Sequence, residues 1–437
     1  VHHDLDFFPL RSEAHIAEGN ALRLDWQAVC PAPDYIIGNP PFVGYSLQSK
    51  EQKEDLLSVY VDEAGKPYKA AGKIDYVAGW YFKAAEMMQG TAIRAALVST
   101  NSITQGEQVA FVWKPLVERF GIHIDFAYRT FRWDSEMAEK AHVHCVIVGF
   151  STAPADHLPR IYDDKGDFIE VSHLNFYLME VEDVFVESRT KALCDVPTMA
   201  KGSQPTDGGA LLIEEEDYAD FIKKEPGALP YIKRFVGAEE FIKGKMRYCL
   251  WLVGVSPAVI RKLPLVLQRV EAVRASRLAS KKEATRKSAD TPTLFQENRQ
   301  PKDNYIIVPS HSSENRKYIP IGFMEKDAIA TNAVLIIPSA SLYHFGILTS
   351  SVHNAWMRAV CGRLKSDYRY SKDIVYNNFP WPTTTDADRA KIEATAEAIL
   401  DARAQYPDSS LADLYDAATM PPDLRRAHAR NDAAVLR

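Results

Sequence analysis

The sequence predicts an α/β fold that leads into a mixed α+β region and a helical C-terminal segment. Over residues 1–150, short apolar runs of strand length alternate with stretches whose apolar residues recur at helical spacing. From residue 151 the chain becomes irregular and rich in Pro and Gly, with isolated short strands. From residue 384 apolar residues again recur at helical spacing. We therefore expect three parts, 1–150, 151–383 and 384–437.

Residues 1–150 carry the elements of a mostly parallel sheet, because strands that alternate with helices usually pair in parallel. The expected strands are 33–39, 94–100, 122–129 and 142–150, and the expected helices are 75–90 and 106–121. Further on we expect a hairpin that turns at Asp164-Lys165-Gly166, a basic helix over 256–287 that breaks at Pro264, and strands at 305–310, 318–324 and 333–339. In the third part, a helix should end before Pro407.

The composition is that of an ordinary globular protein, with 46% hydrophobic and 25% charged residues. No apolar run approaches the roughly 18 residues of a membrane helix, and the first residues do not resemble a signal peptide. The five cysteines are far apart and form no Cys-x-x-Cys pair, which argues against zinc ribbons and disulfide scaffolds. We expect a cytoplasmic protein.

The net charge of −6 is unevenly distributed along the chain. Residues 231–290 contain 14 Lys and Arg and five Asp and Glu, a local charge of +9, so the rest of the chain carries −15. A segregated basic stretch is typical of a surface that binds a polyanion. A solvated helix face is the alternative interpretation.

The segment "YIIGNPPFVG" (35–44) places Asn39, Pro40, Pro41 and Phe42 directly after an expected strand. These residues suit methylation of the exocyclic amine of adenine, a weak nucleophile whose lone pair is delocalised into the ring. The Asn39 side-chain oxygen and the Pro40 carbonyl oxygen can accept from the two N–H groups of that amine and aim its lone pair at an incoming methyl group. Prolines fix the backbone and offer no competing N–H, so both acceptors are preorganised, and Phe42 can stack on a flipped base. A Pro-Pro turn that merely ends the strand is the alternative.

"NPPF" resembles the catalytic motif of amino-methyltransferases that use S-adenosylmethionine, and "AEGNALRLDW" (17–26) resembles the preceding segment of γ-type DNA adenine-N6 methyltransferases. The resemblance implies that residues 1–150 form part of a Rossmann-like class I methyltransferase sheet. It also implies that Asn20 binds the adenine amine of the cofactor and that the backbone N–H of Ala21 binds a ring nitrogen. The family commonly has Asp where this chain has Asn20. A simple strand-end turn at Gly19-Asn20 is the alternative.

Two further segments extend the resemblance. "KIDYVAGWYFKAAEMM" (73–88) resembles the helix beside the cofactor pocket, which implies a cofactor contact for Asp75. "AHVHCVIVGF" (141–150) resembles the last strand of the sheet, at whose start a residue covers the other face of the flipped base. His142, Val143 and His144 are the candidates, and we select His144. A His-x-His pair could instead bind a metal, but no third ligand has suitable spacing, so we expect no metal site. No Gly-rich cofactor loop precedes residue 17, so we expect that loop upstream in a longer polypeptide and weak or absent cofactor binding by this chain alone.

Three blocks, at 236–252, 361–382 and 414–432, resemble the MmeI-like single-chain restriction–modification enzymes. These have an N-terminal nuclease, a central methyltransferase and a C-terminal target-recognition domain. The resemblance implies that residues 151–383 recognise double-stranded DNA. No nuclease signature of clustered carboxylates with a Lys is present, so a nuclease would also lie upstream. The sequence indicates no oligomeric state.

The block "RLKSDYRYSK" (363–372) alternates cations with tyrosines. Arg can read guanine, Lys mainly binds phosphate, and Asp can accept from a cytosine amine. The predicted DNA-binding residues are Lys243, Lys245, Arg247, Arg363, Lys365, Asp367, Arg369 and Lys372. A surface hairpin with internal ion pairs is the alternative for 363–372. "FPWP" (379–382) is expected to be an apolar anchor against the C-terminal segment rather than a wedge between DNA bases.

Together these features predict a site-specific DNA adenine-N6 methyltransferase that uses S-adenosylmethionine and base flipping, within a restriction–modification or phage-defence protein. One alternative is a DNA-recognition module whose catalytic remnant is only structural. Another is a protein-glutamine or RNA methyltransferase with the same Asn-Pro-Pro-Phe chemistry. The large mixed domain after the catalytic strands argues against the last, because glutamine methylation needs no such reader.

Overall fold

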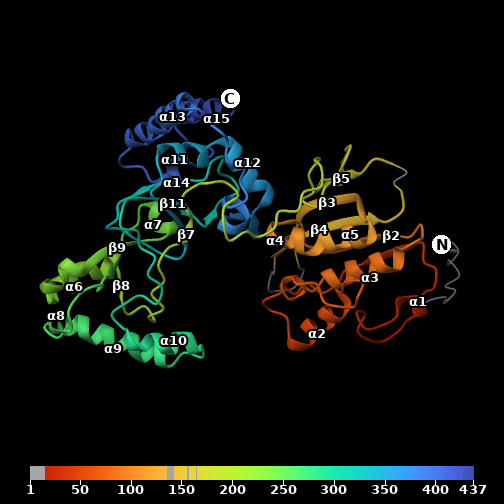
Figure 1. The fold of residues 1–437 in the computed structure, drawn as a ribbon, viewed down its shortest axis with the longest axis horizontal. Coiled ribbons are helices and arrows are strands. Elements are labelled where there is room, and N and C mark those ends of the chain that lie inside the picture. Colours follow the sequence, from red (N-terminus) through yellow and green to blue (C-terminus); the bar gives the residue numbers. More distant parts are fainter. Residues whose placement is uncertain (1–14, 135–141, 155–156, 164) are drawn as a thin grey trace, which may run out of the picture. The chain divides into compact units, whose positions relative to one another are not determined.

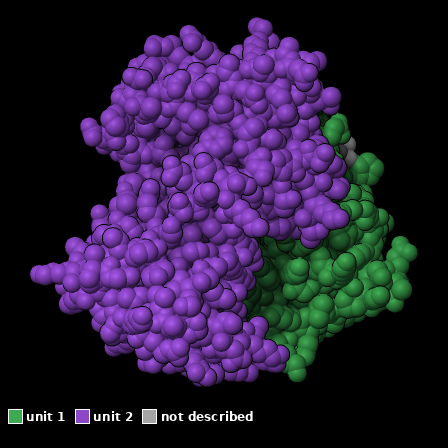
Figure 2. Space-filling model, turned by 60° about the vertical axis from the view of Figure 1, so that its left-hand side comes forward, with its two compact units in different colours: residues 1–187 green, residues 188–437 purple. Residues whose placement is uncertain are grey.

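The computed structural model describes residues 15–134, 142–154, 157–163 and 165–437. The chain forms two compact units, 1–187 and 188–437, whose elements are labelled in Figure 1 and whose surfaces are coloured separately in Figure 2. Among the described residues, no helix has the length and apolar character needed to cross a bilayer.

The first unit is built on a six-stranded sheet in the order β1-β2-β4-β3-β5-β6. Its strands are β1 (Tyr35–Gly38), β2 (Arg94–Thr100), β3 (His123–Asp134), β4 (His142–Ser151), β5 (Arg160–Tyr162) and β6 (Phe168–Glu170). β1 pairs in parallel with β2, and β3 with β5, but β4 lies antiparallel between β2 and β3 and β6 is antiparallel to β5. The prediction of a mostly parallel sheet is therefore wrong. The seven residues between β3 and β4 are too few for the crossover that a parallel pair requires.

The helices of this unit lie beside the sheet, and several of them share one core with it (Figure 1). They are α1 (Trp26–Val29), α2 (Lys50–Val59), α3 (Ala78–Met88), α4 (Gly106–Gln108) and α5 (Lys114–Phe120), with a π-helical segment over Val109–Trp113 between the last two. Leu56 of α2, Tyr81 of α3 and Trp113 are fully buried in one core with the sheet residues Leu97 and Val148. This packing fixes the carboxyl ends of β1 and β2, where the candidate site lies.

Helix α3 begins three residues later than the predicted start at residue 75. The N–H of Asp75 donates to Gln108 Oε1 (3.1 Å) and that of Tyr76 donates to the Val43 carbonyl (2.9 Å). These two residues therefore hold neighbouring loops instead of forming the first helical turn.

Residues 151–187 pack with the first unit. β5 and β6 form the predicted hairpin, in which Gly166 adopts a φ of +88°, while Asp164 lies outside the described residues. Leu174 and Phe176 are buried in the same core as the helices. The compact unit thus ends after Glu187, whereas the sequence placed a boundary after Phe150.

The second unit contains three small sheets, in the orders β14-β9-β10-β8, β13-β11-β15-β7 and β12-β17-β16. Their strands are β7 (Ala200–Lys201), β8 (Leu212–Glu214), β9 (Ile232–Val236), β10 (Arg247–Leu250), β11 (Tyr305–Pro309), β12 (His311–Ser312), β13 (Gly322–Met324), β14 (Ile329–Ala330), β15 (Val334–Pro338), β16 (Gly362–Leu364) and β17 (Asp367–Arg369). The three strands expected between 305 and 339 correspond to β11, β13 and β15.

The helices of this unit are α6 (Glu215–Lys224), α7 (Ala238–Lys243), α8 (Pro257–Ile260), α9 (Pro264–Leu278), α10 (Glu283–Lys287), α11 (Leu342–Leu348), α12 (Ser351–Val360), α13 (Asp386–Ala404), α14 (Leu411–Leu414) and α15 (Pro422–Val435). The basic helix expected over 256–287 restarts at Pro264, as predicted, and breaks a second time after Leu278. Phe379 and Trp381 pack with Tyr343, Ile392 and Ala434, so "FPWP" is the apolar anchor that the sequence predicted.

Candidate active site and nucleic-acid interface

The segment Asn39–Phe42 leaves the carboxyl end of β1, whose last residue, Gly38, lies opposite Leu97 of β2. Asn39 is exposed, and within the described residues no hydrogen bond involves its side chain or the Pro40 carbonyl oxygen. Pro40 is buried, Pro41 is exposed and Phe42 is half-buried. The oxygen acceptors of two adjacent residues at this edge of the sheet thus have no partner within the described residues.

The backbone that follows Phe42 is fixed by Asp75 and Tyr76. One carboxylate oxygen of Asp75 accepts from the Tyr45 N–H (3.0 Å), and the other accepts from the Ser102 hydroxyl. Tyr76 donates its N–H to the Val43 carbonyl. Because both oxygens of Asp75 already have partners, its clearest role is to hold this loop. The cofactor contact inferred for Asp75 stays a prediction.

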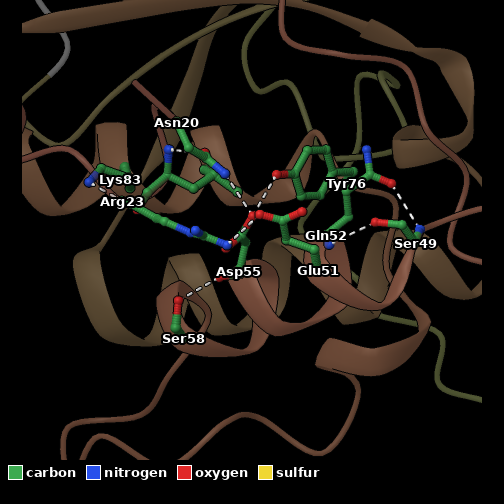
Figure 3. Close-up of polar contacts among 10 residues, drawn as sticks. Asn20, Arg23, Ser49, Glu51, Gln52, Asp55, Ser58, Tyr76 and Lys83 are labelled. Carbon is green, nitrogen blue, oxygen red and sulfur yellow. Dashed lines mark hydrogen bonds and ion pairs between the residues drawn. The ribbon is translucent and has the colours of Figure 1, made fainter. Parts of the chain in front are cut away.

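Asn20 belongs to a polar network around the carboxylate of Asp55, which is only 3% exposed. The Asn20 amide donates to Asp55 Oδ2 (2.7 Å), Arg23 Nε donates to Asp55 Oδ1 (2.6 Å), and the Tyr76 hydroxyl donates to Oδ2 (3.3 Å). Figure 3 shows these three side chains pointing toward Asp55. Hydrogen bonding and ion pairing with Asp55 raise the pKa of Arg23, so this cation stays charged.

The side-chain oxygen of Asn20 accepts from the N–H of Leu22 (3.0 Å), which folds residues 20–22 into a tight turn. Ala21 directly follows Asn20. Its N–H donates to no acceptor among the described residues, while its carbonyl accepts from the Trp26 indole (2.8 Å). A carbonyl oxygen can accept two hydrogen bonds. One acceptor and one donor therefore stand side by side at Asn20 and Ala21, the pair that one edge of an adenine ring requires.

Tyr76 connects the two halves of the candidate site. Its backbone N–H holds the loop after Phe42 and its hydroxyl contacts the carboxylate that orients Asn20. Burial raises the pKa of Tyr76, which keeps this hydroxyl a hydrogen-bond donor. Sequence reasoning missed both residues: Asp55 lies outside the segments with a recognisable motif, and in segment 73–88 only Asp75, the neighbour of Tyr76, was singled out.

His144 and Asn101 lie at the same end of the sheet. Cys145 pairs with Thr100, the last residue of β2, and the half-buried His144 precedes it, opposite Arg132. Asn101 follows β2 directly, is 9% exposed, and its side-chain nitrogen has no hydrogen-bond partner among the described residues. The sequence predicted His144; the segment "LVSTNSITQG" (97–106) resembles the next strand and loop of the family, but no role was predicted for Asn101 within it. In the described part of the chain, no group of three or more His, Cys, Asp or Glu residues is arranged to hold a metal ion.

The first predicted DNA-binding group, at the junction of α7 and β10, is largely paired. Lys243 and Lys245 both contact Glu239 Oε1, at 3.0 and 2.8 Å, and these contacts lower the pKa of Glu239 to about 2. Arg247 Nε lies 3.1 Å from Glu240 Oε1, and its guanidinium covers the Phe235 ring. All three cations have acidic or aromatic partners within the chain.

The second predicted group lies on the β16–β17 hairpin. Lys365, at its tip, is exposed and adopts a φ of +59°, and Asp367 accepts from the Glu314 N–H. Arg363 covers the Tyr368 ring at 4.4 Å and lies 3.8 Å from Glu314, and Lys372 is paired with Asp373. The two tyrosines of this block, Tyr368 and Tyr370, are buried and cannot stack on bases. Arg369 is exposed and forms no ion pair within the described residues.

Two cations of the basic helices point into the protein. Arg277 is 1% exposed and donates to five backbone carbonyl oxygens, those of Pro205, Thr206, Ser288, Thr291 and Leu294. Arg269 donates to the carbonyls of Ala210 and Leu212. The local charge of +9 therefore overstates the basic surface that these helices present.

Three sequence models of one family match successive parts of the chain. They describe the MmeI DNA-methyltransferase domain (residues 2–163), the MmeI target recognition domain (180–383) and the MmeI C-terminal domain (384–437). The chain belongs to the MmeI family. This confirms the family that the motifs indicated.

Individual members of the family are similar over nearly the whole chain. DNA methyltransferase A of Bacillus subtilis (strain 168) is 40% identical over 433 residues, which are 98% of this chain and 48% of that protein. The solved structure of the Type IIL restriction-modification enzyme MmeI in complex with DNA is 46% identical, with a TM-score of 0.91 over 98% of this chain and 57% of that one. The chain thus spans about half the length of these relatives.

Proposed function

We propose that this chain is the methyltransferase and target-recognition part of a site-specific DNA adenine-N6 methyltransferase within a restriction–modification protein. The observation that carries the proposal is the pair of free acceptors, the Asn39 side chain and the Pro40 carbonyl, on a loop held by Asp75 and Tyr76. The MmeI methyltransferase model, which matches residues 2–163, supports the reaction class.

We further propose that the six-stranded sheet is the second half of a Rossmann-like fold. Its parallel pair β1–β2 supports this, since ligands of doubly wound sheets bind outside the carboxyl ends of parallel strands. Asn39 follows β1 and Asn101 follows β2, which puts both at such an edge.

The residues at this edge fit S-adenosylmethionine as the methyl donor. The acceptor on Asn20 and the donor on Ala21 match the amine and a ring nitrogen of its adenine, and a half-buried turn holds them. When bound, this cofactor supplies a methyl group on a positively charged sulfur. We infer that a Gly-rich loop upstream in the same polypeptide completes the pocket, and that a nuclease also precedes it.

In the proposed reaction, Asn39 and Pro40 accept from the two N–H groups of the target amine, which withdraws its lone pair from the ring. Their backbone is rigid because prolines restrict it and Asp75 fixes the loop, so they need no reorganisation during the reaction. Phe42 stacks on one face of the flipped adenine, and His144 covers the other. Within the recognition part, 151–383, the exposed Lys365 and Arg369 are the best candidates for DNA contact.

Substitution of Asn39 by Ala tests this proposal. It deletes one preorganised acceptor and should lower the rate of methyl transfer to duplex DNA at least about 100-fold, measured in the full-length enzyme with labelled cofactor. Asn332, an exposed Asn with no hydrogen bond within the described residues, provides the matched Asn→Ala control and should keep the parental rate. Undiminished methylation by Asn39→Ala would remove the proposed role of this residue.

The same assay separates the alternatives. A non-catalytic recognition module would bind DNA without methylating it in any variant. An RNA or protein-glutamine methyltransferase would modify those substrates and leave duplex DNA unmodified. The cytoplasmic location that we infer from the widely spaced cysteines is a separate proposal.

A further inference from the structure

The Asn20 amide is held in one orientation by a buried carboxylate. A carboxylate can only accept hydrogen bonds, so the Asn20 group that lies 2.7 Å from Asp55 must be the NH2 group. The side-chain oxygen is thereby turned toward the Leu22 N–H and keeps one free acceptor direction. An Asn without such a neighbour could rotate by 180° and present a donor instead.

Asp55 is well suited to this task. It lies on α2, 35 residues from Asn20, and is almost completely buried, so solvent cannot compete for its oxygens. Arg23 neutralises its charge at 2.6 Å and is itself paired with Glu51 at 3.1 Å. Tyr76 adds a third donor. The carboxylate therefore holds three donor groups in place.

We propose that Asp55 is a positioning residue, which makes the Asn20 oxygen an obligatory acceptor for the exocyclic amine of the cofactor adenine. This inference rests on the proposed function. Through the Asn20 amide, the Asp55 carboxylate thereby keeps an acceptor facing the ligand.

The arrangement predicts that the two side chains can be exchanged. Asn20→Asp alone puts two carboxylates in contact, which forces them apart or makes them share a proton. Asp55→Asn alone removes the carboxylate that fixes the Asn20 NH2 group and leaves only the Leu22 N–H to orient the amide. In the double variant Asn20→Asp/Asp55→Asn, the new amide donates to the new carboxylate. Its oxygen still accepts from Arg23, and the Tyr76 hydroxyl can accept instead of donating.

The test is to measure the equilibrium binding of S-adenosylhomocysteine to the full-length enzyme by calorimetry, in the absence of DNA. Each single variant should bind at least about tenfold more weakly than the parent, and the double variant should recover to within about threefold, a coupling that only interacting residues show. Asp34→Asn, which alters an exposed carboxylate with no hydrogen bond in the described residues, is the control and should bind like the parent.

A second ligand distinguishes positioning from general stability. The parent should reject an S-adenosylhomocysteine analogue whose adenine amine is replaced by a methoxy group, because the methoxy oxygen and the Asn20 oxygen are both acceptors, while the unprotonated ring nitrogen can still accept from Ala21. Asp55→Asn should lose part of this discrimination, since its Asn20 amide can turn its NH2 group toward the methoxy oxygen. A purely structural role would weaken both ligands equally.

Three outcomes overturn the inference: single variants that bind like the parent, a double variant no better than the singles, or unchanged discrimination in Asp55→Asn. If a variant fails to fold, Asn20→Ala replaces it, because this change leaves the Asp55–Arg23 pair intact. Full binding with full discrimination by Asn20→Ala would equally contradict the inference. A parent enzyme that binds neither ligand would instead overturn the proposed function itself.

Discussion

The loop after β1 and the cation-rich segments of the second unit differ in whether their polar groups already have partners within the chain. At the loop, Asn39 and Pro40 keep their acceptors free, while buried side chains such as Asp75 fix the backbone around them. In the second unit, the cations that suggested DNA binding mostly have partners already, as Lys245 has with Glu239. A motif predicts where free groups stand because its geometry is local, whereas a charge count does not say which charges are free.

Arg277 offers the strongest test of that contrast. Arg277→Met should lower the free energy of unfolding of the second unit by about 3–5 kcal/mol, because it removes the hydrogen bonds of a buried cation to five carbonyl oxygens and leaves those of Thr206 and Leu294 with no other donor within the described residues. Its exposed neighbour on α9, Arg274, serves as the control, and Arg274→Met should change stability by less than about 0.5 kcal/mol. Urea unfolding of the whole chain measures both values. Equal effects would mean that Arg277 is an ordinary surface cation.

Acid should destabilise the second unit through its buried histidines. His353 is fully buried against the Tyr370 hydroxyl, and burial lowers its pKa to about 3, while burial also lowers that of His428. In the unfolded chain these histidines bind protons below the ordinary histidine pKa of about 6.5, whereas in the folded protein they stay neutral. The free energy of unfolding therefore decreases as the pH falls from about 6.5 toward 3. One such group is worth about 2 kcal/mol at pH 5.

Thermal unfolding at pH 7 and pH 5 measures this loss. His353→Gln can keep a hydrogen bond to Tyr370 but does not titrate, so its stability should depend less on pH than that of the parent. His15→Gln, at an exposed position, should leave the dependence unchanged. A parental slope in His353→Gln would assign the acid sensitivity to other groups.

Substitutions of Arg369 and Lys372 compare a cation without an ion pair in the described residues with a paired one, both in segment 363–372. Arg369→Ala should weaken duplex DNA binding about tenfold and lower the salt slope of the affinity by about 1, if it contacts phosphate. Lys372→Ala should change affinity by less than about threefold, because Lys372 is already paired with Asp373. Binding isotherms between 50 and 200 mM salt measure both. An affinity that hardly depends on salt would argue against phosphate contacts by this hairpin.

Asn101 gives the smallest expected effect. Its buried amide nitrogen has no partner within the described residues, so Asn101→Leu should stabilise the chain by about 1 kcal/mol. If the amide serves the active site, the same change should lower methyl transfer. A variant that is less stable than the parent would indicate that Asn101 has a partner in solution.

The fold was predictable where the signal was local. Strand β1 and its Asn-Pro-Pro-Phe end, the break at Pro264 and the apolar anchor at Phe379 and Trp381 follow from short patterns. The antiparallel pairing of β4 was missed, because strand–helix alternation was applied to a place where β3 and β4 are separated by only seven residues. The late start of α3 was missed because the N–H groups of Asp75 and Tyr76, which precede the helix, bond to the distant residues Gln108 and Val43.

In the candidate site, the sequence predicted the residues proposed to touch a ligand but not the residues that hold them in place. Asn20 and Asn39 could be read from motifs, but Asp55 comes close to Asn20 only after the chain folds. Likewise, no pattern distinguishes Arg277, which is buried, from Arg274, which is exposed, since both lie in one basic helix. Burial and pairing are tertiary properties, and residue type alone does not encode them.

Strand β1 has one more consequence, which concerns the handling of this chain. Among the strands that the structure describes, β1 is hydrogen-bonded on one side only, and its Tyr35 and Ile37 are 69% and 82% exposed. An unpaired strand edge with apolar side chains is a template for strand addition by other molecules. In the proposed fold the upstream half of the sheet would pair with this edge, so the chain handled without that half should be prone to aggregation.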